Sequence, residues 1–308
     1  MRVAVVGAGI SGVACARVLT EAGHDVVVLD RGRVPGGRMA SRRLEGRYVD
    51  LGASYLTARD PAFVAVVDGW LARGIARPWT DTFQVASPAG LGEHKPGPVR
   101  YAAPAGLRSL VTELTAGLDV RQEVEVTAVG PGPSIDLAPY DAVVLAMPDP
   151  QALRLLDPSL AAERAAIDGR AWEPALALAA GWPTRDWEFD GLFVNDSAVL
   201  DWVADDGARR GDGAPVLVAH SSPAFAASRL MDPPAAGPEL VAALRGLLGL
   251  GEPTWSRVQR WTFAKPVGTR EQSHWLGAAG IGLCGDGWGA AKIEAAWLSG
   301  TALGQALA

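Results

Sequence analysis

The sequence predicts an α/β protein in which a domain with a parallel sheet is interrupted by an α+β domain built on an antiparallel sheet. The first thirty residues alternate an apolar strand, a glycine-rich turn, a helix and a second apolar strand, which is the pattern of a βαβ unit. Two later apolar runs, 140–147 and 281–286, have the continuous hydrophobic character of buried parallel strands. The segment 151–274 instead holds short apolar runs that favour antiparallel pairing.

The first βαβ unit carries a dinucleotide-binding fingerprint. The strand 2–6 leads into a glycine-rich turn, a helix is expected over 13–22, and the strand 26–29 ends at an acidic residue. The first glycine allows the tight turn, the second lets the backbone approach a pyrophosphate, and the third allows the helix to pack closely on the strand. The helix N-terminus offers N–H groups to phosphates, and the acid can accept hydrogen bonds from ribose hydroxyls. We therefore expect a Rossmann-like domain that binds a dinucleotide through Gly7, Gly9, Ile10, Ser11, Gly12 and Asp30.

The composition is that of an ordinary globular protein. The chain has 308 residues, of which 49% are hydrophobic and 20% charged, enough for two domains. A net charge of −6 argues against nucleic acid and leaves no basic patch for a membrane surface. Cys15 and Cys284 lie in apolar stretches, so we expect buried thiols in a reducing compartment. The four histidines show no metal-ligand spacing, and no apolar run reaches about 18 residues. We therefore expect no metal site. The N-terminus loosely resembles a signal peptide, but its cleavage would remove the dinucleotide fingerprint, so we expect a cytoplasmic protein.

The segment that follows Asp30 indicates which dinucleotide is bound. A nicotinamide-binding unit would continue into an ordinary loop and helix. A basic loop with paired glycines instead looks like the second signature of FAD enzymes in the glutathione-reductase and amine-oxidase superfamily. Paired glycines permit close backbone approach and an arginine supplies a fixed cation. A strand from residue 48 then ends in small residues that would let the isoalloxazine ring lie against backbone. The sequence thus predicts a glutathione-reductase-type FAD-binding domain, with contacts from Arg31, Gly37, Arg38, Met39, Gly52, Ala53 and Ser54.

Periodicity predicts the remaining elements in chain order. Helices are expected at 61–73, 107–116, 152–156, 161–167, 239–250 and 290–306, and strands at 120–129, 140–147, 175–181, 191–194, 199–203, 215–221, 258–263 and 281–286. Residues 78–103 are rich in proline and glycine and are expected to hold only short β-like pieces. We expect an FAD-binding domain at 1–54, 104–150 and 275–308, and a substrate domain at 55–103 and 151–274.

The last strand and helix are expected to return to the FAD-binding domain. The strand ends in Gly285 and Asp286, and the aspartate can accept a hydrogen bond from a ribityl hydroxyl. The start of the following helix, around Lys292 and Ile293, can point N–H groups at flavin N1 and O2. Such an arrangement would stabilise the anionic reduced ring.

With these residues in view, the chain resembles the renalase-like branch of the flavin amine oxidase superfamily, particularly its bacterial members. The resemblance extends over nearly the full length, and its motifs are Gly36-Gly37-Arg38-Met39, the stretch Asp50–Asp60, Asp196-Ser197 with Leu200-Asp201-Trp202, Arg260-Trp261, and Gly285-Asp286 with Glu294 and Ala296–Gly300. It implies non-covalent FAD, and backbone near Val126 lying beside the adenine. It further implies oxidation of 2- or 6-dihydro isomers of NAD(P)H to NAD(P)+, with O2 reduced to H2O2.

Two departures from the family pattern lie near the expected flavin. The segment 287–292 follows Gly285-Asp286, where relatives tend to have Trp-Cys and then Gly-Arg before the glutamate. Lys265 stands where an arginine is usual. Both changes can alter which substrate the protein accepts.

Hydride transfer to a flavin asks little of side chains, because the cofactor supplies the chemistry. We therefore look for aromatic walls and polar anchors. Tyr55 follows the flavin-facing turn, and Asn195 is a polar candidate. His220 ends a strand and either hydrogen-bonds a carboxamide or is a satisfied core histidine. Trp261 lies in the matched strand and can form a wall against a planar substrate. Lys265 either orders a water near flavin N5 or is solvated in a loop.

Two further interpretations stay open. Oxidation of an amine or amino acid would need an aromatic cage, or an arginine for a carboxylate, and Arg59 and Arg260 are the available cations. The other is that the protein is a non-catalytic interaction module that bound FAD stabilises. The expected partners are a small-molecule substrate and O2.

Overall fold

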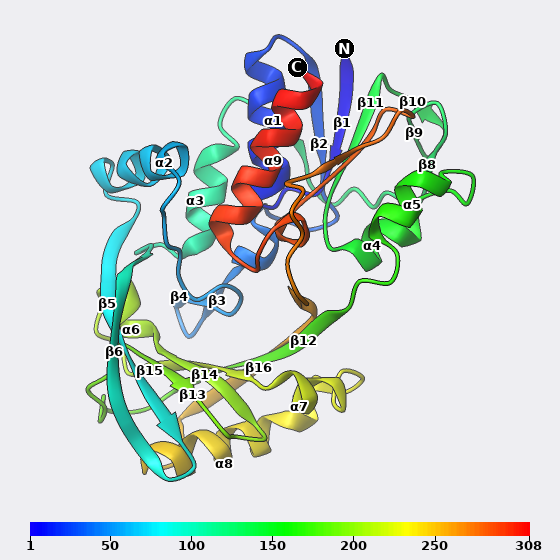
Figure 1. Ribbon diagram of the computed structural model, residues 1–308. Helices are drawn as coiled ribbons and strands as arrows, with labels where there is room; N and C mark the ends of the chain where they lie inside the picture. The colour runs from blue at the N-terminus through cyan, green and yellow to red at the C-terminus, as the bar shows by residue number, and fades with distance from the viewer.

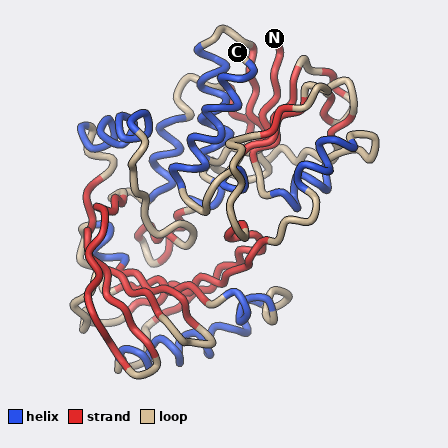
Figure 2. Tube along the Cα trace, in the orientation of Figure 1, coloured by secondary structure: helices blue, strands red, loops and turns tan.

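A computed structural model describes residues 1–308, and it contains two large sheets with helices packed around them (Figure 1). Both chain termini lie beside the first sheet, and the second sheet lies on the other side of the molecule (Figures 1 and 2). No helix combines the length and the apolar character that crossing a membrane requires. Both cysteines are buried and free, as expected.

The first sheet has six strands in the order β17-β18-β11-β1-β2-β7. All neighbouring pairs are parallel except β17 with β18. Its central strands are buried runs of valine, alanine and leucine, which is typical of a parallel sheet covered on both faces. Its strands are β1 (Arg2–Val6), β2 (Asp25–Leu29), β7 (Asp119–Arg121), β11 (Ala142–Ala146), β17 (Trp275–Leu276) and β18 (Ile281–Cys284).

Helices cover both faces of this sheet. One face carries four helices that share one apolar core with the sheet. The other face packs on a second core that includes two helices and a small three-stranded sheet. The first group is α1 (Ile10–Glu21), α2 (Pro61–Ala72), α3 (Leu107–Leu114) and α9 (Ile293–Leu307). The second is α4 (Asp149–Leu155) and α5 (Ala161–Ile167) with β8 (Val129–Gly130), β9 (Ser134–Ile135) and β10 (Ala138–Pro139).

Helices α1 and α9 approach each other very closely. A Cβ added at Gly300 of α9 would lie 1.9 Å from the Ser11 carbonyl oxygen of α1. Only glycine permits this contact, which holds the glycine-rich turn against the end of the chain.

The second sheet has seven strands in the order β16-β12-β15-β14-β13-β5-β6. It is antiparallel except where β13 pairs with β5. Helix α8 packs on the face that points away from the first sheet (Figure 1). The strands are β5 (Arg77–Ser87), β6 (Gly90–Ala102), β12 (Trp172–Gly181), β13 (Gly191–Val194), β14 (Leu200–Asp205), β15 (Val216–Ser221) and β16 (Trp255–Pro266). The remaining elements are the hairpin β3 (Ser41–Leu44) and β4 (Arg47–Asp50), helices α6 (Asp206–Arg210), α7 (Pro223–Ala227) and α8 (Gly237–Leu248), and the short 3-10 turns η1 (Gly37–Met39), η2 (Pro233–Ala236) and η3 (Asp286–Trp288).

The expected fold class is confirmed: a Rossmann-like dinucleotide-binding domain carries a mixed, mostly antiparallel substrate-domain sheet. The domain boundaries stay a prediction. Phe63, Val67 and Trp70 of α2 belong to the first core, although 55–103 was expected in the substrate domain. We therefore propose that α2 belongs with the FAD-binding domain.

Two expected elements were wrong. The strand 120–129 ends at Arg121, because the chain turns to follow the loop after β2, where the Val124 N–H donates to the Asp30 carbonyl at 3.0 Å. Residues 78–103 do not form short pieces but a long two-stranded ribbon, β5 and β6. Bulges accommodate its irregular registers, so the prolines and glycines do not end the strands.

Candidate functional site

One large cavity is lined by residues from both sheets. Its volume is about 2200 Å³ and 61 residues line it. It extends from the glycine-rich turn after β1 to strands β14, β15 and β16 of the second sheet. A single small-molecule site usually occupies about 300–1,000 Å³, so this cavity has room for a cofactor and a second ligand.

The glycine-rich turn is shaped by close contacts on one side and open space on the other. A Cβ on Gly12 would lie 2.0 Å from the Gly7 carbonyl oxygen, whereas a Cβ on Gly9 would meet nothing within 4 Å. The Asp30 carboxylate braces this turn, because it accepts the N–H groups of Ala8 and Gly32 at 2.6 Å each. Each carboxylate oxygen has a second acceptor position, and Asp30 also lines the cavity.

Arginines surround this end of the cavity, although the chain as a whole is acidic. Arg108 is the most enclosed of them, and its Nε is buried without a hydrogen-bond partner. Burial and the nearby Arg42 lower the pKa of the Arg108 guanidinium. Such a group gains from an anionic ligand such as a phosphate. The arginines that line this end are Arg31, Arg33, Arg42, Arg43 and Arg108.

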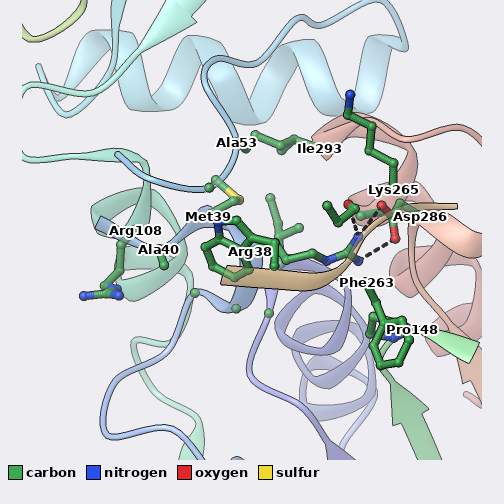
Figure 3. Close-up of a pocket in the computed structure, with 18 of the residues that line it drawn as sticks. Arg38, Met39, Ala40, Ala53, Arg108, Pro148, Phe263, Lys265, Asp286 and Ile293 are labelled. Atoms are coloured by element: carbon green, nitrogen blue, oxygen red, sulfur yellow. Dashed lines mark hydrogen bonds and ion pairs between the residues drawn. The ribbon is translucent and has the colours of Figure 1, made fainter. Parts of the chain in front are cut away.

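Arg38 is fixed by a bidentate ion pair with Asp286 (Figure 3). Its Nη1 and Nη2 donate to the carboxylate at 2.7 and 2.5 Å, and Nη1 also donates to the Ala264 carbonyl at 3.1 Å. Its guanidinium lies 5.3 Å from the centre of the Trp172 ring. The Asp286 carboxylate therefore holds the Arg38 guanidinium in a fixed position.

The turn after β4 is held tightly against β16 and against the loop that contains Gly36, Gly37 and Arg38. A Cβ on Gly52 would lie 1.9 Å from the Arg38 carbonyl oxygen, to which the Ala53 N–H also donates at 2.9 Å. The Trp261 Nε1 donates to the Leu51 carbonyl at 2.7 Å. The small side chains at this turn leave its backbone accessible from the cavity.

The substrate sheet also fixes this turn, through Ser54. The Trp202 Nε1 donates to the Ser54 Oγ at 2.9 Å. Arg209 is fully buried and donates to the Ser54 and Asp50 carbonyls at 3.1 and 2.9 Å. Arg209 is itself paired with the buried Asp206 at 2.6 Å.

An aromatic cluster forms one wall of the cavity at the substrate-sheet end. Tyr55, Phe193 and Trp202 line the cavity, and Phe83 packs behind them. The Phe83 ring centre lies 5.2 Å from Tyr55, 5.5 Å from Phe193 and 4.7 Å from Trp202. Burial raises the pKa of the Tyr55 hydroxyl, although Arg100 opposes the shift, so this tyrosine stays neutral at physiological pH. The wall suits a planar or apolar group.

His220 is a neutral polar group in the same cavity. Burial, together with Lys265 and Arg209, lowers the pKa of its imidazole from 6.5 to about 3. Its Nε2 is buried without a hydrogen-bond partner in the protein. The ring is therefore available to a ligand as an uncharged donor or acceptor.

Asp201 and Lys265 add charged groups to the cavity wall. Burial, with a smaller effect of Glu173, raises the pKa of the Asp201 carboxyl, while Lys265 opposes the shift. Lys265 is exposed, as expected for a solvated side chain, but it lies on β16 and not in a loop. Its place in a strand directs it toward the cavity (Figure 3).

The structure brings the predicted site residues together in this cavity. Gly12 is the one exception, and it packs α1 closely against Gly7 of the turn and Ala146 of β11. The last helix begins at Ile293 rather than 290, because residues 285–292 form a tight turn first. The predicted residues that line the cavity are Gly7, Gly9, Ile10, Ser11, Asp30, Arg31, Gly37, Arg38, Met39, Gly52, Ala53, Ser54, Tyr55, Val126, Asn195, His220, Trp261, Gly285, Asp286, Lys292 and Ile293.

Many cavity residues were not predicted as site residues, and four of these lie at the substrate end. Phe193 and Trp202 lie on strands whose alternation identified them as sheet residues, not as site residues. Asp201 and Trp202 were quoted only as part of the Leu200-Asp201-Trp202 motif. Arg100 lies in the ribbon that was expected to be irregular. The proposed carboxylate clamps, Arg59 and Arg260, line the cavity but are exposed.

The fold and the cavity together define a dinucleotide-binding protein with a separate substrate sheet. The chain belongs to the flavin-containing amine oxidoreductase family, whose model matches residues 82–306, more than half of the chain. A model of the NAD(P)-binding Rossmann-like domain matches residues 5–70.

Individual relatives match only over a short segment. Amine oxidase B from Homo sapiens is 51% identical over 55 residues, 18% of this chain and 11% of that protein. Hydroxyneurosporene desaturase from Rubrivivax gelatinosus is 43% identical over 58 residues, 19% of this chain and 11% of that protein. The structure of putrescine oxidase bound to putrescine has a TM-score of 0.76 at 16% identity, covering 99% of this chain and 98% of that one. This last likeness establishes the fold alone.

The residues present fit the flavin cofactor that the family implies. The open space at Gly9 and the arginines around it suit a pyrophosphate. The unpartnered Nε of Arg108 leaves a buried donor that an anionic ligand would satisfy. The tight turn at Gly52 offers accessible backbone on the path toward the aromatic wall.

Proposed function

We propose that this protein is an FAD-dependent oxidase that removes a hydride from a carbon bonded to nitrogen. The observation that carries the proposal is the single cavity, which runs without a break from the glycine-rich turn to the aromatic wall. Such a cavity can hold a dinucleotide and a substrate end to end. Family membership supports the same type of reaction.

FAD would be held without a covalent bond. The turn at Gly9, the brace at Asp30 and the fixed Arg38 would bind the adenosine, the pyrophosphate and the start of the ribityl chain. When bound, FAD supplies the hydride acceptor and passes the electrons to O2, giving H2O2. Backbone near Val126, which lines the cavity, would lie beside the adenine.

The side chains of the substrate end would position the donor and exclude water. Tyr55 and Trp202 form a rigid wall, so a bound ring or alkyl group can present only one carbon to the flavin. A misplacement of about 1 Å can cost about a hundredfold in rate, which makes this positioning the main contribution of the protein. His220 stays neutral, so it can hydrogen-bond a substrate without taking a proton from it.

An amine or amino acid is the substrate class that the comparisons favour. The family model is that of amine oxidoreductases, and the matched relatives include an amine oxidase and an L-amino-acid oxidase from Sistrurus catenatus edwardsii. Oxidation would take the hydride from the carbon that carries the amine. The aromatic wall of Tyr55, Phe193 and Trp202 suits the uncharged form of that amine.

A 2- or 6-dihydro isomer of NAD(P)H is the second candidate, and the renalase-like sequence pattern supports it. Carbons 2 and 6 of the nicotinamide ring are both bonded to the ring nitrogen, so the chemistry is the same as for an amine. His220, with its free Nε2, and the exposed Asn195 line the same cavity and can bind a carboxamide. Normal NADH carries its hydride on carbon 4, which is not bonded to nitrogen.

Anaerobic reduction of the purified FAD-loaded protein separates these candidates. A panel of amines, amino acids, 2- and 6-dihydronicotinamide isomers and normal NADH would be mixed with the protein, and bleaching of the flavin would be followed by stopped-flow absorbance. We expect bleaching by one of the first three groups and little by normal NADH. Rapid bleaching by normal NADH, or by no member of the panel, would contradict the proposal.

A further inference from the structure

Arg100 is a buried arginine without an acidic partner. It lies on β6, the residue is 8% exposed, and no aspartate or glutamate forms an ion pair with it. The other two buried arginines, Arg209 and Arg210, are both paired with buried aspartates. Arg100 therefore stands apart from the remaining buried charges of this protein.

The protein satisfies Arg100 only in part. Its Nη1 donates to the Asp81 carbonyl, and its guanidinium lies 4.0 Å from the centre of the Phe83 ring. Its Nε and Nη2 groups have no hydrogen-bond partner in the protein, and they remain partly exposed to the cavity. A buried charge without a counter-charge is costly, and an arginine fork is shaped to bind a carboxylate or phosphate.

Arg100 lines the cavity at the substrate end. Phe83, on which it stacks, packs against Tyr55 and Trp202, and Trp202 is bonded to Ser54 of the turn after β4. The glycine-rich turn that would hold the FAD pyrophosphate belongs to the first sheet, whereas Arg100 belongs to the second. Because Arg100 stacks on Phe83 behind the aromatic wall, an anion bound to it would belong to the substrate rather than to the FAD pyrophosphate.

We propose that Arg100 binds an anionic group of the substrate, a carboxylate or a phosphate, and thereby selects substrates that carry a negative charge in addition to the oxidised carbon–nitrogen bond. This inference rests on the proposed function, because it assigns a substrate class to the same cavity. An amino acid supplies the charge as a carboxylate, and a dihydronicotinamide nucleotide supplies it as a phosphate. A simple alkylamine lacks it.

The test measures binding rather than turnover. FAD-loaded protein is titrated by calorimetry with benzoate, phenyl phosphate and the neutral benzyl alcohol, which share one aromatic ring. Hydrogen bonds to a charged group predict that one of the two anions binds about tenfold or more tightly than the alcohol. Which anion is preferred separates the carboxylate from the phosphate source.

Substitutions then show which residue causes the preference for an anion over the alcohol. Arg100→Gln should abolish it while the FAD content stays unchanged, and Arg100→Lys should keep only part of it because the fork is lost. Arg260→Gln, at an exposed arginine of the same cavity, is the matched control and should retain it. If Arg100→Gln fails to fold, the lysine variant alone carries the test, since a purely structural arginine would leave the anion preference unchanged.

The outcomes are separable from those of the proposed function. Equal binding of anions and alcohol by the wild type, or loss of the preference in Arg260→Gln but not in the Arg100 variants, would overturn the assignment of Arg100. A protein that shows the Arg100-dependent preference but whose flavin no donor reduces would retain this inference and lose the proposed reaction.

Discussion

His220 should make the protein less stable in mild acid. Its pKa falls from 6.5 to about 3 in the folded state, so the native protein does not take up the proton that an unfolded histidine accepts below pH 6.5. Unfolding therefore becomes more favourable as the pH falls through 6.5, and this continues down to about pH 3. A pH of about 5 lies roughly 1.5 units below the pKa of the unfolded histidine. At this pH the free energy of unfolding is therefore about 2 kcal/mol lower than at pH values well above 6.5.

His220→Gln removes this titration. Between about pH 7.5 and pH 5, the variant should lose about 2 kcal/mol less stability than the wild type, which corresponds to about 3 °C in Tm for a chain of 308 residues. Thermal unfolding of the FAD-loaded proteins, followed by tryptophan fluorescence at both pH values, measures this difference. His94→Gln, at an exposed histidine of β6, is the matched control and should behave like the wild type. The same acid sensitivity in His220→Gln and the wild type would refute the reasoning.

Three further predictions concern the FAD site and the cavity wall. Gly12→Ala should abolish FAD binding, since its Cβ would lie 2.0 Å from the Gly7 carbonyl, whereas Gly246→Ala, where nothing lies within 4 Å, should bind FAD normally in an equilibrium titration. Asp30→Ala removes the acceptor of two backbone N–H groups as well as the expected ribose contact, so the Kd for FAD should rise at least about tenfold; an unchanged Kd would show that the ribose acid is misassigned. Trp261→Ala should slow anaerobic flavin reduction while FAD stays bound, and an unchanged rate would exclude this ring from the substrate wall.

The dinucleotide-binding half could be predicted from local sequence because its features are local. The turn between β1 and α1, its glycines and Asp30 are contiguous or nearly so, and their spacing follows from the geometry of one βαβ unit. Tyr55 and Trp261 were predicted as site residues because they follow or lie within quoted motifs. Both line the cavity.

The substrate end could not be predicted in the same way, because it is assembled from distant strands. Trp202 and Phe193 meet Phe83 only because β13 pairs in parallel with β5, a pairing that alternation within a strand does not reveal. Arg100 lies in a ribbon whose prolines and glycines suggested irregular chain, and bulges instead keep it a strand. That His220 remains neutral depends on burial and on Lys265 from another strand, neither of which is visible in its neighbours along the chain.

The central claim is that a carbon bonded to nitrogen gives its hydride to FAD in this cavity, and the isotope effect on flavin reduction tests it most directly. The most active donor of the anaerobic panel would be prepared with deuterium at that carbon and compared with the unlabelled donor by stopped-flow absorbance at saturating concentration. The account predicts that the flavin bleaches with both donors and several-fold more slowly with the deuterated one. Equal rates for a donor labelled at that carbon, together with slowing when the label is at a carbon not bonded to nitrogen, would contradict it.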